Sequence, residues 1–117
     1  MPTKIIEQQI QKTDLSALEL KTRDGALVKA VVDVELAIII AGMAMHSDGE
    51  EILLENGSKQ ANLWGINLYL QQSADDWIEY DSVINLRPSQ GNISRGVDDP
   101  AVQQKIRNII NQLVKQA

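Results

Sequence analysis

The sequence predicts an α+β fold: an antiparallel sheet of four to five strands with helices packed on one face, a two-layer sandwich that includes a C-terminal helix. Two observations carry this prediction. Apolar and polar residues alternate along residues 28–36, 63–70 and 77–87, which is typical of strands that bury one face. The last part of the chain instead repeats apolar residues at helical spacing after an Asp-Pro pair, which favours a final helix.

The first third of the chain gives the weakest pattern. Residues 4–10 are weakly strand-like, within a segment 1–12 that is either a weak strand or a loose terminus. Ser16 or Thr13 is then the candidate N-cap of a helix that is predicted to end at Gly25.

The segment that follows is the clearest strand. Residues 28–36 alternate strictly and are rich in valine, which predicts a half-buried strand. Residues 37–45 are apolar on both sides, so periodicity does not separate a strand from a helix there. We favour a strand that pairs back on residues 28–36 as a hairpin, and a helix that ends at Gly42 is the alternative.

A short helix is predicted next. Asp48 is its candidate N-cap, residues 49–56 form the helix, and Gly57 supplies the left-handed residue at which helices often end.

The remaining segments predict a second hairpin and the final helix. Residues 63–70 and 77–87 alternate, and the polar linker 71–76 is short enough to join them as neighbouring antiparallel strands. Asp99 then precedes Pro100, a good N-cap followed by proline at the first helical position.

Length and composition agree with one domain that has an aliphatic core. The 117 residues match the size of a single domain, so we expect residues 1–117 to form one unit. Hydrophobic residues make up 44% of the chain, but aromatic residues make up only 3% and phenylalanine is absent. Isoleucine, leucine and valine must therefore fill the core.

Charge and cysteine content narrow the function classes. A formal net charge of −5 opposes binding to phosphate backbones, so we expect no nucleic-acid partner. The absence of cysteine excludes disulfides, thiolate metal sites and a cysteine nucleophile. No apolar run reaches the roughly 20 residues of a membrane span, and MPTKIIEQQIQK lacks the apolar region of a signal peptide. We expect a cytoplasmic protein without a membrane partner, a cofactor or a bound metal.

One side of the predicted strands is polar. The residues that alternation places on this side are Lys29, Asp33, Glu35, Asn67, Tyr69, Glu79, Asp81, Asn85 and Arg87. Such a face commonly points into water, where cross-strand charge pairs keep the protein soluble. The functional alternative is an open surface that receives a ligand or a partner.

The loop RPSQGNISRG, residues 87–96, is the best candidate ligand site. Arginine presents a planar fork that fits phosphate or carboxylate in two-point contact, and the glycines allow backbone N–H groups to converge. The candidate ligand-binding residues are Arg87, Ser89, Asn92, Arg95 and, just before the loop, Asn85. The alternative is a structural loop held by Arg–Asp pairs and by turn bonds from Asn and Ser.

His46 and a set of carboxylates form a second candidate site. His46 is the only histidine and lies beside Ser47 and Asp48, so it is a candidate general base. Acids that share a sheet face can shift each other's pKa values or bind a hard cation, and the candidates are Asp33, Glu35, Glu79 and Asp81. A structural role for His46 and a solvated acidic face are the alternatives.

Three segments resemble a known family. VKAVVDVE, ENGSKQANLWGINLY and IEYDSVINLRPSQGNISR are similar to a family of small prokaryotic proteins that is known only as a domain of unknown function. The resemblance covers roughly residues 26–115, and LWGINLY with INLRPSQGN is its most specific part. It implies a single-domain bacterial or archaeal protein and transfers no activity, cofactor or catalytic residue.

Three functional hypotheses follow. The first is a binding or interaction module that holds a small anionic ligand or an acidic protein segment at the loop, beside the polar sheet face. The second is a small hydrolase-type enzyme that uses His46 with some of the acids, with a divalent cation as an option. The third is a structural homodimer without small-molecule chemistry. Enzymatic activity is the less favoured reading.

Overall fold

The computed structural model describes residues 3–23 and 25–116. Its strands are β1 Lys4–Ile6, β2 Ile10–Gln11, β3 Leu20–Thr22, β4 Gly25–Asp33, β5 Ile38–Ala41, β6 Leu63–Leu68, β7 Ile78–Glu79 and β8 Val114–Lys115. Its α-helices are α1 His46–Glu55 and α2 Pro100–Leu113. Short 3-10 helices, η1 to η5, occupy Lys12–Leu18, Gln60–Asn62, Ala74–Trp77, Val83–Asn85 and Pro88–Gln90.

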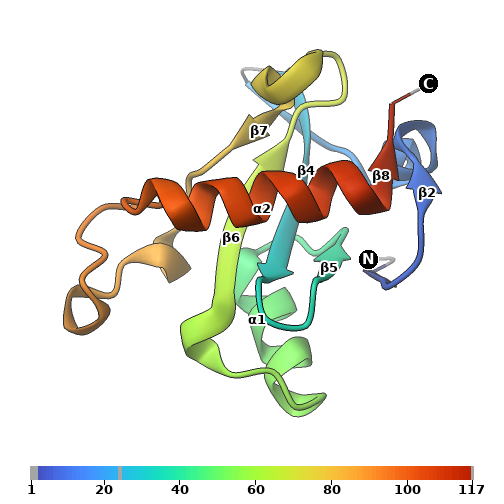
Figure 1. Cartoon of the computed structure of the whole chain (residues 1–117). Helices are drawn as coiled ribbons and strands as arrows, with labels where there is room; N and C mark the ends of the chain where they lie inside the picture. Colours follow the sequence, from blue (N-terminus) through green and yellow to red (C-terminus); the bar gives the residue numbers. More distant parts are fainter. Residues whose placement is uncertain (1–2, 24, 117) are drawn as a thin grey trace.

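The main sheet is antiparallel throughout and has the strand order β1-β5-β4-β6-β7, with β3 paired to β4 outside this path. β2 and β8 form a separate parallel pair beside the end of α2. The predicted α+β class, the antiparallel sheet and the C-terminal helix are confirmed (Figure 1). The hairpin favoured for residues 37–45 is also present, because β5 pairs with β4 from Ala30↔Ala41 to Asp33↔Ile38.

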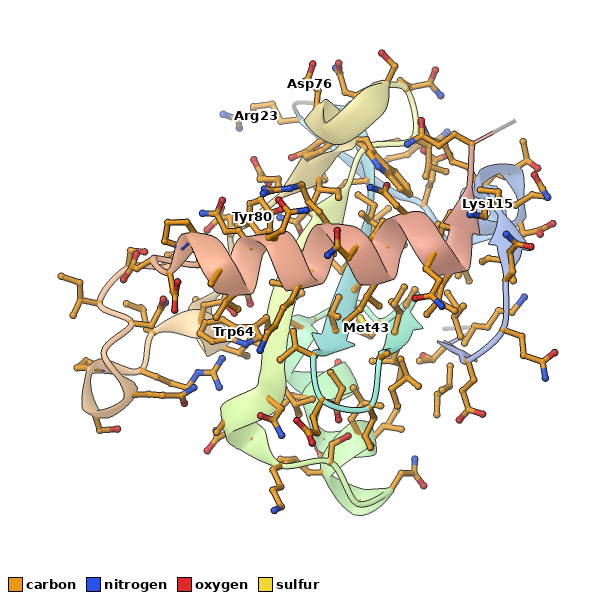
Figure 2. All side chains as sticks on the ribbon, in the orientation of Figure 1. Arg23, Met43, Trp64, Asp76, Tyr80 and Lys115 are labelled. Atoms are coloured by element: carbon orange, nitrogen blue, oxygen red, sulfur yellow. The ribbon has the colours of Figure 1, made fainter. Side chains whose placement is uncertain are left out.

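The main core lies between α2 and one face of the sheet. Val28, Ala30 and Val32 of β4 alternate toward this face and pack with Ile106 and Ile110 of α2. Figure 1 shows α2 lying across β4 and β6. Tyr80 and Trp64 lie beside this helix (Figure 2).

The Asp99 side chain accepts the N–H of Ala101, as the predicted N-cap requires. Among the described residues, no helix is long and apolar enough to cross a membrane.

The structure differs from the predicted two-layer sandwich in the place of α1, which packs on the opposite face. Val31 and Ile40 point to that face and form a second core cluster with Leu53 of α1. The physical reason is that β5 is apolar on both sides and that Val31 of β4 adds to its second face, so this part of the second face also needs cover. Gly49 lets α1 approach closely, since a Cβ atom there would lie 3.1 Å from Ile40 Cγ2.

The first predicted helix is wrong in type. The segment forms η1, and the chain then enters β3, which turns back onto β4 and pairs Leu20 with Leu27. Gly25, expected to end a helix, instead has a φ of 123° at the start of β4. Residues 20–22 pair with β4, so they are not available to extend a helix.

The strand predicted for residues 77–87 is also wrong in length. β7 contains only Ile78–Glu79, and the chain then crosses the sheet face and forms η4, Val83–Asn85. The helix predicted at residues 49–56 begins earlier, at His46, with Met45 as its N-cap, so that Asp48 lies in the first turn. Gly57 follows that helix with a φ of 103°, as its left-handed role requires.

The β4–β5 hairpin contains a strained position. Ala37 has a φ of 55° and is the one non-glycine residue with a positive φ in the described ranges. Its N–H donates to the carbonyl of Asp33 at 2.9 Å, which closes the turn. A Cβ atom is unfavourable in this left-handed conformation.

We predict that Ala37→Gly stabilises the protein. The left-handed conformation costs an L-residue about 1–2 kcal/mol, and the greater freedom of glycine in the unfolded chain offsets about 0.5–1 kcal/mol of the gain. Denaturant unfolding should therefore show an increase of about 0.5–1 kcal/mol. Ala44→Gly, at an exposed residue without a positive φ, is the control and should lower stability. Equal effects of the two changes would contradict the assignment of strain to Ala37.

Candidate functional site

The site begins where the chain leaves the edge of the sheet. β6 continues past the end of β7, and the side-chain amide of Asn85 takes the place of the missing strand beside Gly65. Asn85 Oδ1 accepts the N–H of Gly65 at 2.8 Å, and Asn85 Nδ2 donates to the Gly65 carbonyl at 3.0 Å. Asn85 has no exposed surface. This pairing satisfies the strand edge and lets residues 80–84 cross the face of the sheet.

Ser82 packs directly on Gly65. A Cβ atom at residue 65 would lie 2.6 Å from Ser82 Oγ, so only glycine admits this contact. The Ser82 N–H donates to the carbonyl of Arg95 at 2.9 Å, and Asn85 Nδ2 donates to the same carbonyl at 2.9 Å. Residue 95 is thereby fixed beside residues 80–84, which we call the crossing segment.

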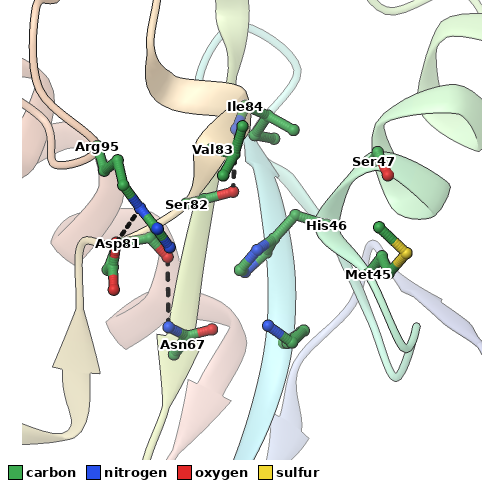
Figure 3. A pocket seen from close by; sticks show the side chains of 10 residues that line it. Met45, His46, Ser47, Asn67, Asp81, Ser82, Val83, Ile84 and Arg95 are labelled. Atoms are coloured by element: carbon green, nitrogen blue, oxygen red, sulfur yellow. Dashed lines mark hydrogen bonds and ion pairs between the residues drawn. The ribbon is translucent and has the colours of Figure 1, made fainter.

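A cavity of ≈ 350 Å³ lies between this crossing segment and the first turn of α1, on the face opposite α2. We call it the sheet pocket. It is lined by Lys29, Met45, His46, Ser47, Asn67, Asp81, Ser82, Val83, Ile84 and Arg95 (Figure 3). The volume lies in the range of small-molecule sites, about 300–1,000 Å³.

His46 enters the pocket from the first turn of α1 and is 8% exposed. Its Nε2 lies 2.8 Å from the carbonyl oxygen of Ile66. Because a carbonyl oxygen only accepts, Nε2 carries the proton, and Nδ1 keeps a lone pair in the neutral ring. This contact also ties α1 to β6.

The surroundings of His46 favour the neutral ring. Burial is the main cause that lowers its pKa below the usual 6.5, and the positive charge of Lys29 acts in the same direction. The hydrogen bond to the Ile66 carbonyl, followed by the charge of Asp81 and the amide of Asn67, acts in the opposite direction without overcoming the effect of burial. A neutral imidazole with a free lone pair can accept a hydrogen bond or a proton from a bound molecule.

Asn67 forms part of the pocket floor and is 5% exposed. Its Nδ2 donates to Glu79 Oε1 at 2.8 Å and to the main-chain carbonyl of Asp81 at 3.3 Å. Its Oδ1 is buried and accepts no hydrogen bond from the residues that the structure describes. The floor therefore presents an unused acceptor.

Arg95 and Lys29 bring positive charge to the pocket. Arg95 Nε donates to Asp81 Oδ1 at 2.8 Å in an ion pair whose side chains are 56% and 45% exposed. Lys29 projects from β4, where its register partner on β6 is Asn67. The Lys29 ammonium group has no ion pair within the described part of the chain.

The other loop residues are used within the protein. The Arg87 guanidinium donates to the carbonyls of Gln60 and Leu63 and lies 4.2 Å from the centre of the Trp64 ring. Asn92 Nδ2 donates to the carbonyls of residues 85, 94 and 96, and its Oδ1 accepts the N–H of Asp98. Ser89 is exposed in η5. Of the predicted ligand-binding residues, only Arg95 lines the pocket.

Asp98 holds the same loop by its carboxylate. It accepts the hydroxyl of Ser94 and the N–H of Ile93, the latter at 2.7 Å, and these hydrogen bonds lower its pKa in that order of importance. The loop is thus held by Asp, Asn and Ser contacts, and the ion pair that Arg95 forms among the described residues goes to Asp81, outside the loop.

The candidate carboxylates do not form one cluster. Asp33 is fully buried, where it accepts the N–H groups of Glu35 and Leu36 and the hydroxyl of Ser58. Glu35 lies with Asp33 beside a different depression, whereas Asp81 lines the sheet pocket. Across residues 3–23 and 25–116, no group of three or more His, Asp or Glu side chains is placed to hold a metal ion.

Alternation had placed Lys29, Asn67 and Asp81 on one face, and all three line the pocket. Sequence patterns did not reveal the pocket roles of Ser47 and Ser82 or the apolar rim of Met45, Val83 and Ile84. No signal in the sequence places these residues together, because their meeting depends on where α1 and the crossing segment dock.

We predict that His46 makes stability depend on pH. Since its folded pKa is lowered, the unfolded chain binds a proton near pH 6.5 that the folded chain resists, so acidification favours unfolding. Between pH 7 and pH 5 the free energy of unfolding should fall more for the wild type than for His46→Gln, which keeps an N–H donor. Parallel stability curves for the two proteins, measured by urea unfolding, would contradict the lowered pKa.

No curated protein and no solved structure matches this chain, but a family model does. The sequence model of the family described as Protein of unknown function (DUF5674) matches residues 4–113, which is nearly the whole chain. The resemblance seen in the sequence is therefore confirmed, and the chain belongs to the DUF5674 family.

Proposed function

We propose that the chain is a binding module for a small anionic ligand, which is held in the sheet pocket. The observation that carries the proposal is the convergence of Lys29 of β4 and Arg95 of the 87–96 loop on one cavity, beside the first turn of α1. These groups come from distant parts of the sequence and face the same space. Convergent polar groups in a concave site of this volume are the usual marks of a ligand site.

Arg95 supplies the two-point contact. Only its Nε is used by Asp81, so both terminal nitrogens of the guanidinium are without a hydrogen bond to the described residues. A guanidinium fork with two free terminal donors fits a carboxylate or a phosphate. In this proposal, Asn85 and Asn92 act as positioning residues, since they bind the carbonyls of residues 94 to 96.

Lys29 and α1 add to the positive potential. No side chain caps the first turn of α1, a helix of 10 residues, and Ser47 in that turn lines the pocket. Main-chain N–H groups at such a helix start favour a negative charge. This local arrangement supports anion binding on a chain whose net charge is −5.

The test is a titration with inorganic phosphate and with acetate, followed by the backbone amide NMR shifts. We expect the largest shifts at Ser47, Asn67 and Arg95. Lys29→Gln and Arg95→Gln should each weaken binding about tenfold, as the loss of one charged hydrogen bond implies.

Lys105→Gln is the matched control, because Lys105 is exposed on α2 on the other side of the sheet. It removes the same charge but should leave the affinity unchanged. Shifts confined to residues 87–90, no shifts at all, or an equal loss in the control would contradict the proposal.

A further inference from the structure

We infer that the ligand is a small carboxylic acid with an N–H or O–H donor on the carbon next to the carboxylate, that is, an α-amino or α-hydroxy acid with an apolar side chain. This inference rests on the proposed anion site and specifies what else the ligand carries. Its basis is the buried, unpaired oxygen of Asn67 in a pocket that also holds Lys29 and Arg95.

The orientation of the Asn67 amide is fixed by its neighbours. The nitrogen lies toward Glu79 and the Asp81 carbonyl, both of which only accept hydrogen bonds. A flipped amide would place its oxygen against these acceptors and lose both bonds. Figure 3 shows the oxygen turned away from Asp81, toward the side of the pocket on which His46 lies.

This oxygen needs a donor from the ligand. A buried acceptor without a partner is unfavourable, and a bound N–H or O–H group would remove that penalty. The neutral ring of His46 does not supply the donor, because its Nε2–H is engaged by Ile66 and its Nδ1 is itself an acceptor. Only the charged ring could donate to Asn67, and burial of His46 disfavours that form by lowering its pKa. Two neutral acceptors thus face the pocket, and the Asp81 carboxylate on its wall is a third acceptor.

The acceptor and the cation lie close together. Lys29 and Asn67 are direct register partners on β4 and β6. Directly opposed residues of antiparallel strands have Cβ atoms about 4.5–5.5 Å apart. Both groups can therefore contact one small ligand that carries its anionic group and its donor on neighbouring atoms, as α-amino and α-hydroxy acids do.

The rim of the pocket is apolar. Met45 and Val83 line it and are 60% and 64% exposed, which is unusual for such side chains. They come from opposite walls, the residue before α1 and the start of η4. An aliphatic substituent on the ligand would cover both of them and bury apolar surface.

The test compares three acids of the same carbon skeleton by calorimetry and NMR: leucine, 2-hydroxy-4-methylpentanoate and 4-methylpentanoate. The first two carry the neighbouring donor and the third lacks it. We expect leucine or the hydroxy acid to bind at least tenfold more tightly than 4-methylpentanoate. Tighter binding of leucine would identify the ammonium form, and tighter binding of the hydroxy acid the neutral donor.

Asn67→Ala should abolish the difference between the donor-bearing acids and 4-methylpentanoate, while Asn56→Ala, at an exposed residue after α1, should preserve it. The wild-type comparison stands by itself if Asn67→Ala does not fold. Equal wild-type affinities for the three acids would overturn the inference but leave the anion site intact. Binding of phosphate without any of these acids would also overturn it, whereas the absence of all binding would remove the proposed function as well.

Discussion

The pairing of the Asn85 amide with the backbone of Gly65 is the interaction on which the functional face depends. A sheet edge normally ends in another strand, in charged side chains or in water. Here a single side chain completes the edge of β6 from within the fold. The chain is therefore free to leave the sheet after Glu79 and to form a wall above it. The sheet pocket depends on this arrangement, because a β7 strand that continued along β6 would leave the pocket without a wall on that side.

The same amide links the wall to the arginine that we propose as the anion contact. The Arg95 carbonyl accepts hydrogen bonds from the Asn85 side chain and from the Ser82 N–H. Asn92 then binds the carbonyls on both sides of residue 95. The loop that carries Arg95 is thus rigidly connected to the sheet, and pre-organised donors lose less entropy when a ligand binds. The opposite wall depends on α1, which His46 ties to the Ile66 carbonyl.

The sequence allowed the sheet and its polar side to be predicted, because alternation along β4 and β6 reflects the face to which each side chain points. It did not reveal the end of β7. Ser82, Ile84 and Leu86 continue the alternating sequence pattern after the strand has ended, but in the structure Ser82 and Asn85 are buried and Leu86 is exposed. An asparagine that imitates a strand looks the same as one that projects from a strand. Ala37 gives no warning of its left-handed conformation either, because that conformation belongs to the turn that the β4–β5 pairing closes.

The candidate site was predictable only in parts. The arginine-rich loop was recognised by its donors, but whether a donor is free depends on carbonyls far away in the sequence, such as Leu63 for Arg87. His46 and Asp81 were recognised as titratable groups, but their meeting with Lys29 required the position of α1. Residue types indicate capacity for chemistry, and tertiary packing decides which of these capacities face one space.

Amide hydrogen exchange at Gly65 tests the central claim most directly. The Gly65 N–H points away from β4 and has the Asn85 side chain as its partner. We expect this N–H, together with the side-chain NH2 of Asn85, to exchange as slowly as the amides inside the β4–β6 ladder. Exchange of Gly65 at the rate of an exposed loop amide would show that the edge of β6 is open, and would contradict the claim that the Asn85 amide creates the wall of the sheet pocket.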